Sequence, residues 1–216
     1  MKTTFLRGFF LLALLGPVLS ASADVASELT GKLVTLRGKA VIPYAATELP
    51  QAQYIALYFS AGWCGPCHQF TPELVKFYHE MKPKYPGFEV IFMSRDQSPN
   101  DMEKYMAEMQ MPWPGMRFSA AKSDRALNKY CGSGIPCLVV LNEKGEVLSD
   151  SFVGKEYVGP YRVMNDLKRM LSDGPASAAT ATAAASATTL TSAGPAKNTV
   201  QSPSGTDWNA AFKKKP

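Results

Sequence analysis

The sequence lacks the signatures of several large classes of enzyme. It contains no Walker loop, no G-x-G-x-x-G fingerprint, no zinc-type cysteine and histidine spacing and no Ser-His-Asp order. These absences leave phosphate-loop, dinucleotide-binding and triad chemistry without support. The only two histidines, His68 and His79, are too far apart for a two-histidine metal site on one helix, which prefers a spacing near four. We therefore expect no metal and no cofactor.

Net charge is also missing from the part of the chain that can fold. The formal charge of +5 comes from the two ends, and residues 24–173 carry equal numbers of basic and acidic side chains. A nucleic-acid binder needs a concentrated cationic face on its folded part. We therefore expect no nucleic-acid partner, and the 216 residues with 46% hydrophobic content indicate one globular domain.

The chain has no hydrophobic run long enough to span a bilayer, which takes roughly 20 residues. The short apolar stretch 8–15 follows Lys2 and Arg7 and precedes Ala21-Ser22-Ala23, which together are typical of a signal peptide cleaved after Ala23. A buried N-terminal helix is the alternative. No cysteine stands at the processing site for a lipid anchor. We expect a mature chain with no membrane span, exported to the periplasm or secreted, where disulfides are permitted.

Residues 174–216 form a second segment outside the predicted domain. They are rich in Ala, Ser and Thr and offer too little apolar bulk to offset the entropy of ordering. We predict a disordered tail. Trp208 and Phe212 lie one helical turn apart before three lysines, which fits either a docking peptide or a frayed terminus.

Strands alternate with helices over residues 24–173. Hydrophobic periodicity predicts a hairpin at 33–42, strands at 54–59, 88–93 and 136–141, and a further strand over 146–153. It predicts helices at 65–81, kinked by Pro72, and at 98–110, 125–130 and 159–171. This order indicates a single α/β domain, residues 24–173, with an N-terminal β-hairpin extension.

Two cysteines stand where the first buried strand passes into the first long helix. They form the motif Trp63-Cys64-Gly65-Pro66-Cys67. A cysteine at a helix N-terminus faces free backbone N–H groups and the positive end of the helix dipole, which both favour the thiolate. The spacing places the second sulfur one turn along the helix. We expect Cys64 to attack and Cys67 to resolve the mixed disulfide, with Gly65 leaving room for a substrate.

At these residues the chain resembles the thioredoxin superfamily, specifically its tryparedoxin and nucleoredoxin-like branch. The matching residues are 57–67, 70–74, 88–94, 111–113, 134–136 and 138–139. The resemblance spans roughly residues 30–172 and implies a thioredoxin fold, with a central mixed sheet flanked by helices. It also implies a cis peptide at Ile135-Pro136, beside the redox pair, where substrate backbone docks.

The sequence departs from this family at two places. Thioredoxins carry a buried acid where this chain has Tyr58, which leaves water, Glu73 or no specific group to relay protons. Family members usually carry Thr after the cis-proline, where this chain has Cys137, and Cys131 precedes it. Cys131 and Cys137 are candidates for a second disulfide, for two small buried hydrophobic residues, or for a pair that accepts oxidising equivalents from Cys64 and Cys67.

These observations predict an exported, monomeric thiol–disulfide oxidoreductase. We expect it to reduce disulfides of partner proteins, because the Gly-Pro insert is similar to that of reductases. We also expect an upstream thiol reductant or oxidant as a second partner. Disulfide oxidation or isomerisation by the same pair is an alternative. Another is c-type haem attachment, since His68 completes a C-x-x-C-H pattern. Ten methionines suggest copper, but Met102, Met106 and Met109 have the spacing of a helix core stripe.

Overall fold

The computed structural model describes residues 24–38, 40–45, 49 and 52–173. The predicted signal peptide at 1–23 and the predicted tail at 174–216, with Trp208 and Phe212, lie outside the described residues. Their boundaries therefore stay predictions.

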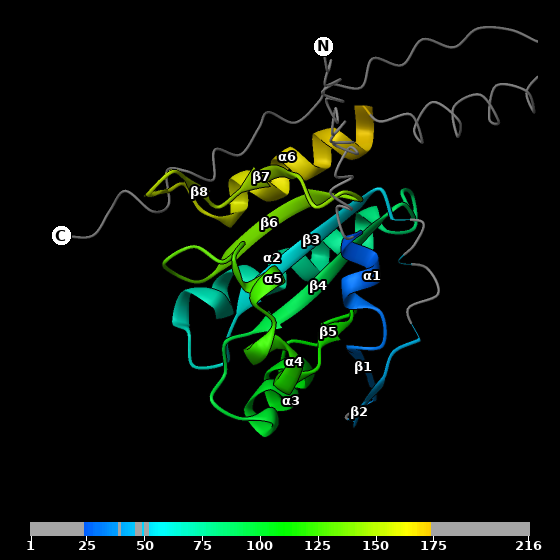
Figure 1. Ribbon diagram of the computed structural model, residues 1–216, viewed down its shortest axis with the longest axis vertical. Helices are drawn as coiled ribbons and strands as arrows, with labels where there is room; N and C mark the ends of the chain where they lie inside the picture. The colour runs from blue at the N-terminus through cyan, green and yellow to red at the C-terminus, as the bar shows by residue number, and fades with distance from the viewer. Residues whose placement is uncertain (1–23, 39, 46–48, 50–51, 174–216) are drawn as a thin grey trace, which may run out of the picture.

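A seven-stranded mixed sheet forms the centre of the molecule, in the order β2-β1-β5-β4-β3-β6-β7 (Figure 1). β3 pairs parallel with β4 and antiparallel with β6. A separate antiparallel pair, β8 and β9, follows the sheet. The strands are β1 (Leu33–Arg37), β2 (Ala40–Pro43), β3 (Tyr54–Ser60), β4 (Phe88–Ser94), β5 (Gly115–Met116), β6 (Cys137–Asn142), β7 (Val147–Asp150), β8 (Phe152–Val153) and β9 (Glu156–Tyr157).

Helices cover both faces of the sheet and bury two separate apolar cores. Residues of α2, α3 and α6 pack in the first core, and residues of α1, α4 and α5 pack in the second. In Figure 1, α1 and α5 lie in front of the sheet and α2 lies behind it. The helices are α1 (Val25–Leu29), α2 (Gly65–Met81), α3 (Pro99–Glu108), α4 (Phe118–Ser123), α5 (Arg125–Asn128) and α6 (Pro160–Asp173). This arrangement confirms the predicted mixed sheet flanked by helices.

The central strands are apolar on both faces because helices cover both faces. β3, β4 and β6 are buried along almost their whole length, as strands covered on two sides require. The predicted helix at 65–81 is confirmed, and it continues through the exposed Pro72. The predicted methionine stripe is also confirmed, since Met102 and Met106 are buried in the first core and Met109 packs against it.

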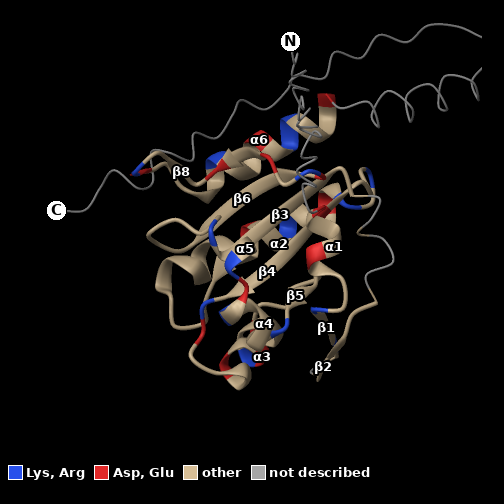
Figure 2. Ribbon diagram, viewed as in Figure 1, with Lys and Arg blue, Asp and Glu red and all other residues tan. Residues whose placement is uncertain are grey.

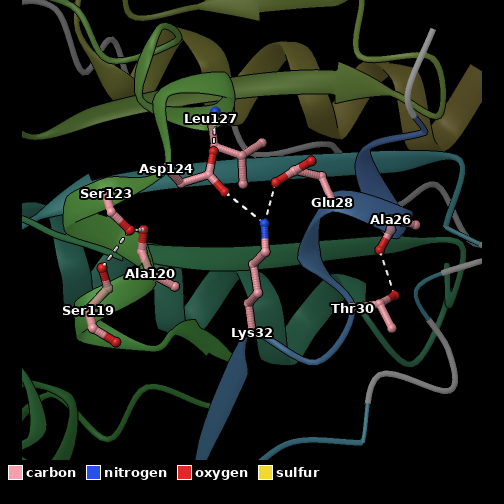
Figure 3. Close-up of polar contacts among 9 residues, drawn as sticks. All are labelled: Ala26, Glu28, Thr30, Lys32, Ser119, Ala120, Ser123, Asp124 and Leu127. Carbon is pink, nitrogen blue, oxygen red and sulfur yellow. Dashed lines mark hydrogen bonds and ion pairs between the residues drawn. The ribbon is translucent and has the colours of Figure 1, made fainter. Parts of the chain in front are cut away.

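The predicted N-terminal hairpin is confirmed, and it is part of the central sheet. β1 pairs antiparallel with β2 and also with β5, through Leu33↔Met116 and Val34↔Gly115. Ahead of the hairpin, Lys32 connects two parts of the fold (Figure 3): its Nζ pairs with Glu28 of α1 and lies 3.0 Å from Asp124 Oδ2, beside α5. The segment that precedes β1 therefore packs against the rest of the domain.

The strand predicted over 146–153 was wrong in its length. β7 ends at Asp150, and the chain turns at Ser151 into the separate β8–β9 pair. The turn is fixed because the Ser151 hydroxyl bonds the backbone of Leu138 on both its N–H, at 2.8 Å, and its carbonyl, at 3.0 Å. The helix predicted over 125–130 is also shorter, ending at Asn128, and the short elements α1, α4 and β5 were not predicted.

Charged residues of both signs are interspersed over the described ribbon in Figure 2. This distribution agrees with the balanced count of acidic and basic side chains in residues 24–173. Among the described helices, none has the length and apolar character needed to cross a membrane.

Candidate active site

Cys64 and Cys67 form a disulfide at the N-terminal end of α2. The two Cα atoms are 5.2 Å apart, a separation within the ordinary range for a disulfide. Cys64 is the N-cap of α2, and its Sγ accepts the backbone N–H of Cys67 at 3.2 Å. The position therefore supplies the backbone donor and the helix dipole that stabilise negative charge on this sulfur.

The two sulfurs differ in their access to solvent. Cys67 is fully buried, whereas Cys64 is 4% exposed and lines a surface pocket. The order of access agrees with the predicted roles, although Cys64 is more enclosed than the sequence led us to expect. Trp63 is 62% exposed beside it, and a Cβ placed on Gly65 would meet no atom within 4 Å. The approach to Cys64 therefore lies over Gly65.

Ile135 and Pro136 lie directly against this pair, as predicted. Their peptide bond is cis, which confirms the isomer that the resemblance implied. The Cys64 Sγ lies 3.8 Å from the Ile135 carbonyl oxygen. Tyr157 of β9 donates its hydroxyl to the Pro136 carbonyl oxygen at 2.7 Å, so the β8–β9 pair holds this loop from the far side.

One pocket collects the candidate site residues from three separate segments. They come from the turn before α2 with the first residues of that helix, from the residue after β4, and from the end of α5 with the loop to β6. Its lining consists of Trp63, Cys64, Gly65, Pro66, Arg95, Asn128, Cys131, Gly132, Ser133, Gly134 and Ile135. The structure thus brings together every predicted site residue except the buried Cys67, Pro136 and Cys137, which lie behind the lining.

Residues after β4 position the cysteine loop, and sequence reasoning missed them. Asp96 is fully buried and accepts the backbone N–H of Gly62 at 2.7 Å and the hydroxyl of Ser94 at 2.8 Å. The indole N–H of Trp63 donates to the Arg95 carbonyl oxygen at 3.2 Å. The carboxylate of Asp96 follows a strand that the sequence did predict, and this placement was the available signal.

His68 takes part in fixing the same loop. Its Nε2 lies 2.6 Å from the Gly62 carbonyl oxygen. This contact favours a positioning role for His68 over the alternative of haem attachment. Within the described residues, no group of three or more His, Cys, Asp and Glu side chains is placed to hold a metal ion.

A network of hydroxyl groups lies behind Cys67. Thr71 donates to the Cys67 carbonyl oxygen at 2.7 Å, and its hydroxyl also lies 2.7 Å from each of the Tyr58 and Tyr105 hydroxyls. Ser60 continues the network, 3.0 Å from the Tyr105 hydroxyl. Burial raises the pKa of Tyr58 well above its usual value. Neutral hydroxyls therefore occupy the region where thioredoxins place an acid.

Cys131 and Cys137 are both free thiols in the structure, so the second disulfide stays a prediction. Cys131 is half-buried at the pocket and Cys137 is buried. Hydrogen bonding from the Cys137 thiol, then from Arg95, lowers the pKa of Cys131 to about 6, although burial opposes this. The same hydrogen bond to Cys131, together with burial, raises the pKa of Cys137. The hydrogen bond between the two side chains therefore favours the thiolate at Cys131 and the protonated thiol at Cys137.

Comparisons with known proteins agree with this geometry. Residues 52–147 match the family model described as thioredoxin-like. Probable nucleoredoxin 1 of Arabidopsis thaliana is 40% identical over 101 residues, which cover 46% of this chain and 17% of that protein. Nucleoredoxin of Homo sapiens is 34% identical over 117 residues, which cover 54% of this chain and 25% of that protein. The chain therefore spans a quarter or less of the length of these curated relatives.

Solved structures extend the similarity over the whole length of smaller proteins. Thioredoxin from Wuchereria bancrofti is 30% identical, with a TM-score of 0.51 and coverage of 68% of this chain and 99% of that one. Tryparedoxin II complexed with glutathionylspermidine is also 30% identical, with a TM-score of 0.50 and coverage of 67% and 91%. These matches confirm both the predicted fold and the predicted resemblance.

Proposed function

Since the chain belongs to the thioredoxin-like family of thiol–disulfide oxidoreductases, we propose that it reduces disulfides of exported partner proteins through Cys64 and Cys67. The observation that carries the proposal is the Cys64–Cys67 disulfide at the start of α2, next to the cis Ile135-Pro136 peptide. One sulfur lines a pocket, the other is buried behind it, and a backbone segment lies alongside for a substrate chain to dock.

The chemistry follows from this order of access. In the reduced enzyme the Cys64 thiolate attacks one sulfur of a substrate disulfide, and the other substrate sulfur leaves as a thiol. The new Cys64–substrate disulfide is then attacked by Cys67, which releases the reduced substrate and leaves Cys64 and Cys67 joined. The backbone N–H of Cys67, 3.2 Å from the Cys64 sulfur, stabilises the charge on Cys64 both as attacking and as leaving group.

A trapping experiment tests this mechanism. The Cys67→Ser, Cys131→Ser variant keeps the attacking sulfur and lacks both the resolving one and the other thiol that lines the pocket, so it should accumulate mixed disulfides between Cys64 and partner proteins. Mass spectrometry of the captured species should place the cross-link on Cys64. The matched control, which adds Cys64→Ser, should capture nothing. Failure of the first variant to form any mixed disulfide with a model protein disulfide such as insulin would contradict the proposal.

The direction of electron flow is tested by the reduction potential of the Cys64–Cys67 pair. A reductase should have a potential close to that of thioredoxin, about −270 mV, whereas a strong oxidant lies near −120 mV. Equilibration of the purified chain with glutathione or dithiothreitol redox buffers gives this value directly. A potential near the upper figure would replace reduction by disulfide donation.

Export is a separate part of the proposal and has its own test. It is supported by the basic start, short apolar stretch and Ala21-Ser22-Ala23 site. Produced with its natural N-terminus in a bacterial host, the chain should be recovered outside the cytosol, beginning at Asp24. Recovery in the cytosol with residues 1–23 intact would contradict export and leave the redox mechanism unaffected.

A further inference from the structure

The pocket beside Cys64 contains a second pair of thiols that the proposed reduction does not use. Cys131 lines the same pocket as Cys64, and Cys137 lies behind it at the start of β6, fully buried. Two side-chain hydrogen bonds converge on Cys131, one from the Cys137 thiol and one from Arg95. The pocket therefore contains two sulfurs from different segments, and each has a buried cysteine behind it.

We propose that Cys131 and Cys137 are a second redox pair, which exchanges electrons with Cys64 and Cys67 by direct thiol–disulfide exchange across this pocket. The proposal rests on the proposed function, because it needs a reactive sulfur at Cys64. It assigns to the loop between α5 and β6 a part in electron transfer in addition to the docking of substrate backbone.

The charges around Cys131 suit a nucleophile better than a structural thiol. Arg95 faces it with a cation, and Asp150 faces it with an acid whose pKa is raised by burial. The lowered pKa of Cys131 gives the attacking thiolate near neutral pH. Cys137 belongs to the second core, whereas Cys131 packs against that core and also lines the pocket with Arg95, so one sulfur of this pair is accessible from the pocket.

The loop that carries Cys131 is packed against Phe152 of β8 at Gly132 and has open space at Gly134. It reads Cys131-Gly132-Ser133-Gly134, and a Cβ placed on Gly134 would meet no atom within 4 Å. At its other end the loop is fixed, because Ile135 lies against Cys64 and Pro136 is bonded to Tyr157. Cys131 is therefore on a short glycine-rich segment whose far end is anchored at the first redox pair.

The exchange balances without any external oxidant. The Cys131 thiolate attacks Cys64 Sγ, a Cys131–Cys64 bond forms, and the Cys64–Cys67 bond breaks as Cys67 leaves and takes up a proton. Cys137 then loses its proton and attacks Cys131 Sγ, and Cys64 leaves as a thiolate. One disulfide is broken and one is formed, and two electrons pass from Cys131 and Cys137 to Cys64 and Cys67. The reverse sequence removes oxidising equivalents from Cys131 and Cys137.

A variant that retains one sulfur of each pair tests the central step. Cys67→Ser with Cys137→Ala leaves Cys64 and Cys131 and replaces the buried thiol by a small apolar side chain. One equivalent of 5,5′-dithiobis(2-nitrobenzoate) should form an adduct at Cys64. Cys131 should then attack this adduct, release a second equivalent of thionitrobenzoate and give a Cys64–Cys131 disulfide that peptide mass spectrometry identifies.

The matched control adds Cys131→Ser and should stop at the Cys64 adduct, with one equivalent released. A Cys64 adduct that persists while Cys131 stays free to be alkylated would overturn the second pair and leave the proposed reductase intact. A Cys64 that forms no adduct in either variant would overturn both proposals.

The unaltered chain provides a measurement that does not depend on the folding of variants. Fully reduced protein treated with one equivalent of oxidised dithiothreitol or glutathione, quenched with acid and mapped, should contain both the Cys64–Cys67 and the Cys131–Cys137 disulfides. Full oxidation should consume all four thiols. If only Cys64–Cys67 is found even at full oxidation, the second pair does not exist.

Discussion

The four cysteines differ in their surroundings, and these differences separate their roles. Cys64 caps a helix and Cys67 is sealed behind it. Cys131 is beside a guanidinium group at the pocket, and Cys137 donates to it from the core. The same side chain therefore acts as nucleophile, resolving thiol or buried donor according to which polar groups surround the sulfur.

The reactivity of Cys131 should depend on Arg95. In a chain with Cys64→Ser and Cys67→Ser, which has no disulfide for Cys131 to attack, iodoacetamide should label Cys131 with a midpoint near pH 6, because its lowered pKa of about 6 keeps the thiolate dominant above that pH. The Cys137 hydrogen bond is the larger cause of this lowering and Arg95 the smaller, so in Arg95→Gln the pKa should rise in part and labelling at pH 6 should fall several-fold.

Peptide mapping across a pH series measures this dependence. Lys129→Gln removes an exposed cation two positions from Cys131 and provides the control, with an expected change of less than twofold. If the two variants have the same midpoint, Arg95 does not stabilise the thiolate.

Asp96 should contribute to stability through the cysteine loop. In Asp96→Ala the Gly62 N–H and the Ser94 hydroxyl lose their shared acceptor, and the loss should lower the free energy of unfolding by about 1–3 kcal/mol. Asp96→Asn keeps an oxygen for Gly62 and should cost less than half as much. Urea denaturation of the three chains measures the difference, and equal effects of the two substitutions would contradict the role of the acceptor.

The loop of residues 131–136, which borders Cys64, contacts both strands of the β8–β9 pair. Phe152 of β8 packs over Gly132, and its ring is 5.1 Å from that of Tyr157 in β9, centroid to centroid. Tyr157 in turn bonds Pro136. The small β8–β9 pair therefore acts as a support for the loop that borders Cys64.

A side chain at Gly132 should disturb this support. A Cβ there would lie 2.2 Å from two ring carbons of Phe152, so Gly132→Ala forces the ring or the loop to move and should cost about 1–3 kcal/mol of unfolding free energy. In a Phe152→Ala background the ring is absent, so Gly132→Ala should cost less there than it does in the unaltered chain. A double-mutant cycle by urea denaturation measures this difference.

Gly134→Ala is the internal control for this cycle. Its added Cβ would contact nothing within 4 Å, and we expect a change within about 0.5 kcal/mol. An equal cost at both glycines would show that loop flexibility, and not the contact with Phe152, sets the effect.

The sequence predicted elements whose signal is local and missed features that depend on distant partners. The strands at 54–59, 88–93 and 136–141 are continuous apolar runs, and the helix at 65–81 has a regular stripe, so each was visible by itself. β5 has two residues and forms only because β1 and β4 flank it. β8 breaks from β7 because Ser151 bonds Leu138, which no local pattern reveals.

The candidate site was likewise predictable where its signal is local and was missed where it depends on distant partners. The Cys64–Cys67 motif lies within five residues, and the resemblance supplied Ile135 and Pro136. Asp96 and Arg95 were missed because they reach the site only when the end of β4 comes beside the turn before α2, as the parallel pairing of β3 and β4 requires. The pairing of Cys131 with Arg95 also depends on this assembly.

The folded body extends beyond the segment that matches the family. The matched residues are 52–147, yet α1 and β1 contribute Val25, Leu29 and Leu33 to the second core, and α6 covers the first. Strand order also places β1 and β2 at one edge of the central sheet, next to β5. The cooperative unit should therefore include both flanks.

Leu33 provides a direct test of this extent. It is 2% exposed and pairs with Met116 of β5, so Leu33→Ala removes apolar contacts between the hairpin and the core and should lower the free energy of unfolding by about 2–5 kcal/mol. Arg37→Ala, at the exposed end of the same strand, should change it by no more than about 0.5 kcal/mol. Urea denaturation can be followed by the fluorescence of Trp113, which is fully buried in the first core, in a background where Trp63 and Trp208 are replaced by Phe. A single transition lowered by Leu33→Ala would show that the hairpin and the redox domain unfold together. If the transition seen from Trp113 is unchanged, the hairpin is an appendage, and the domain that carries Cys64 is stable without it.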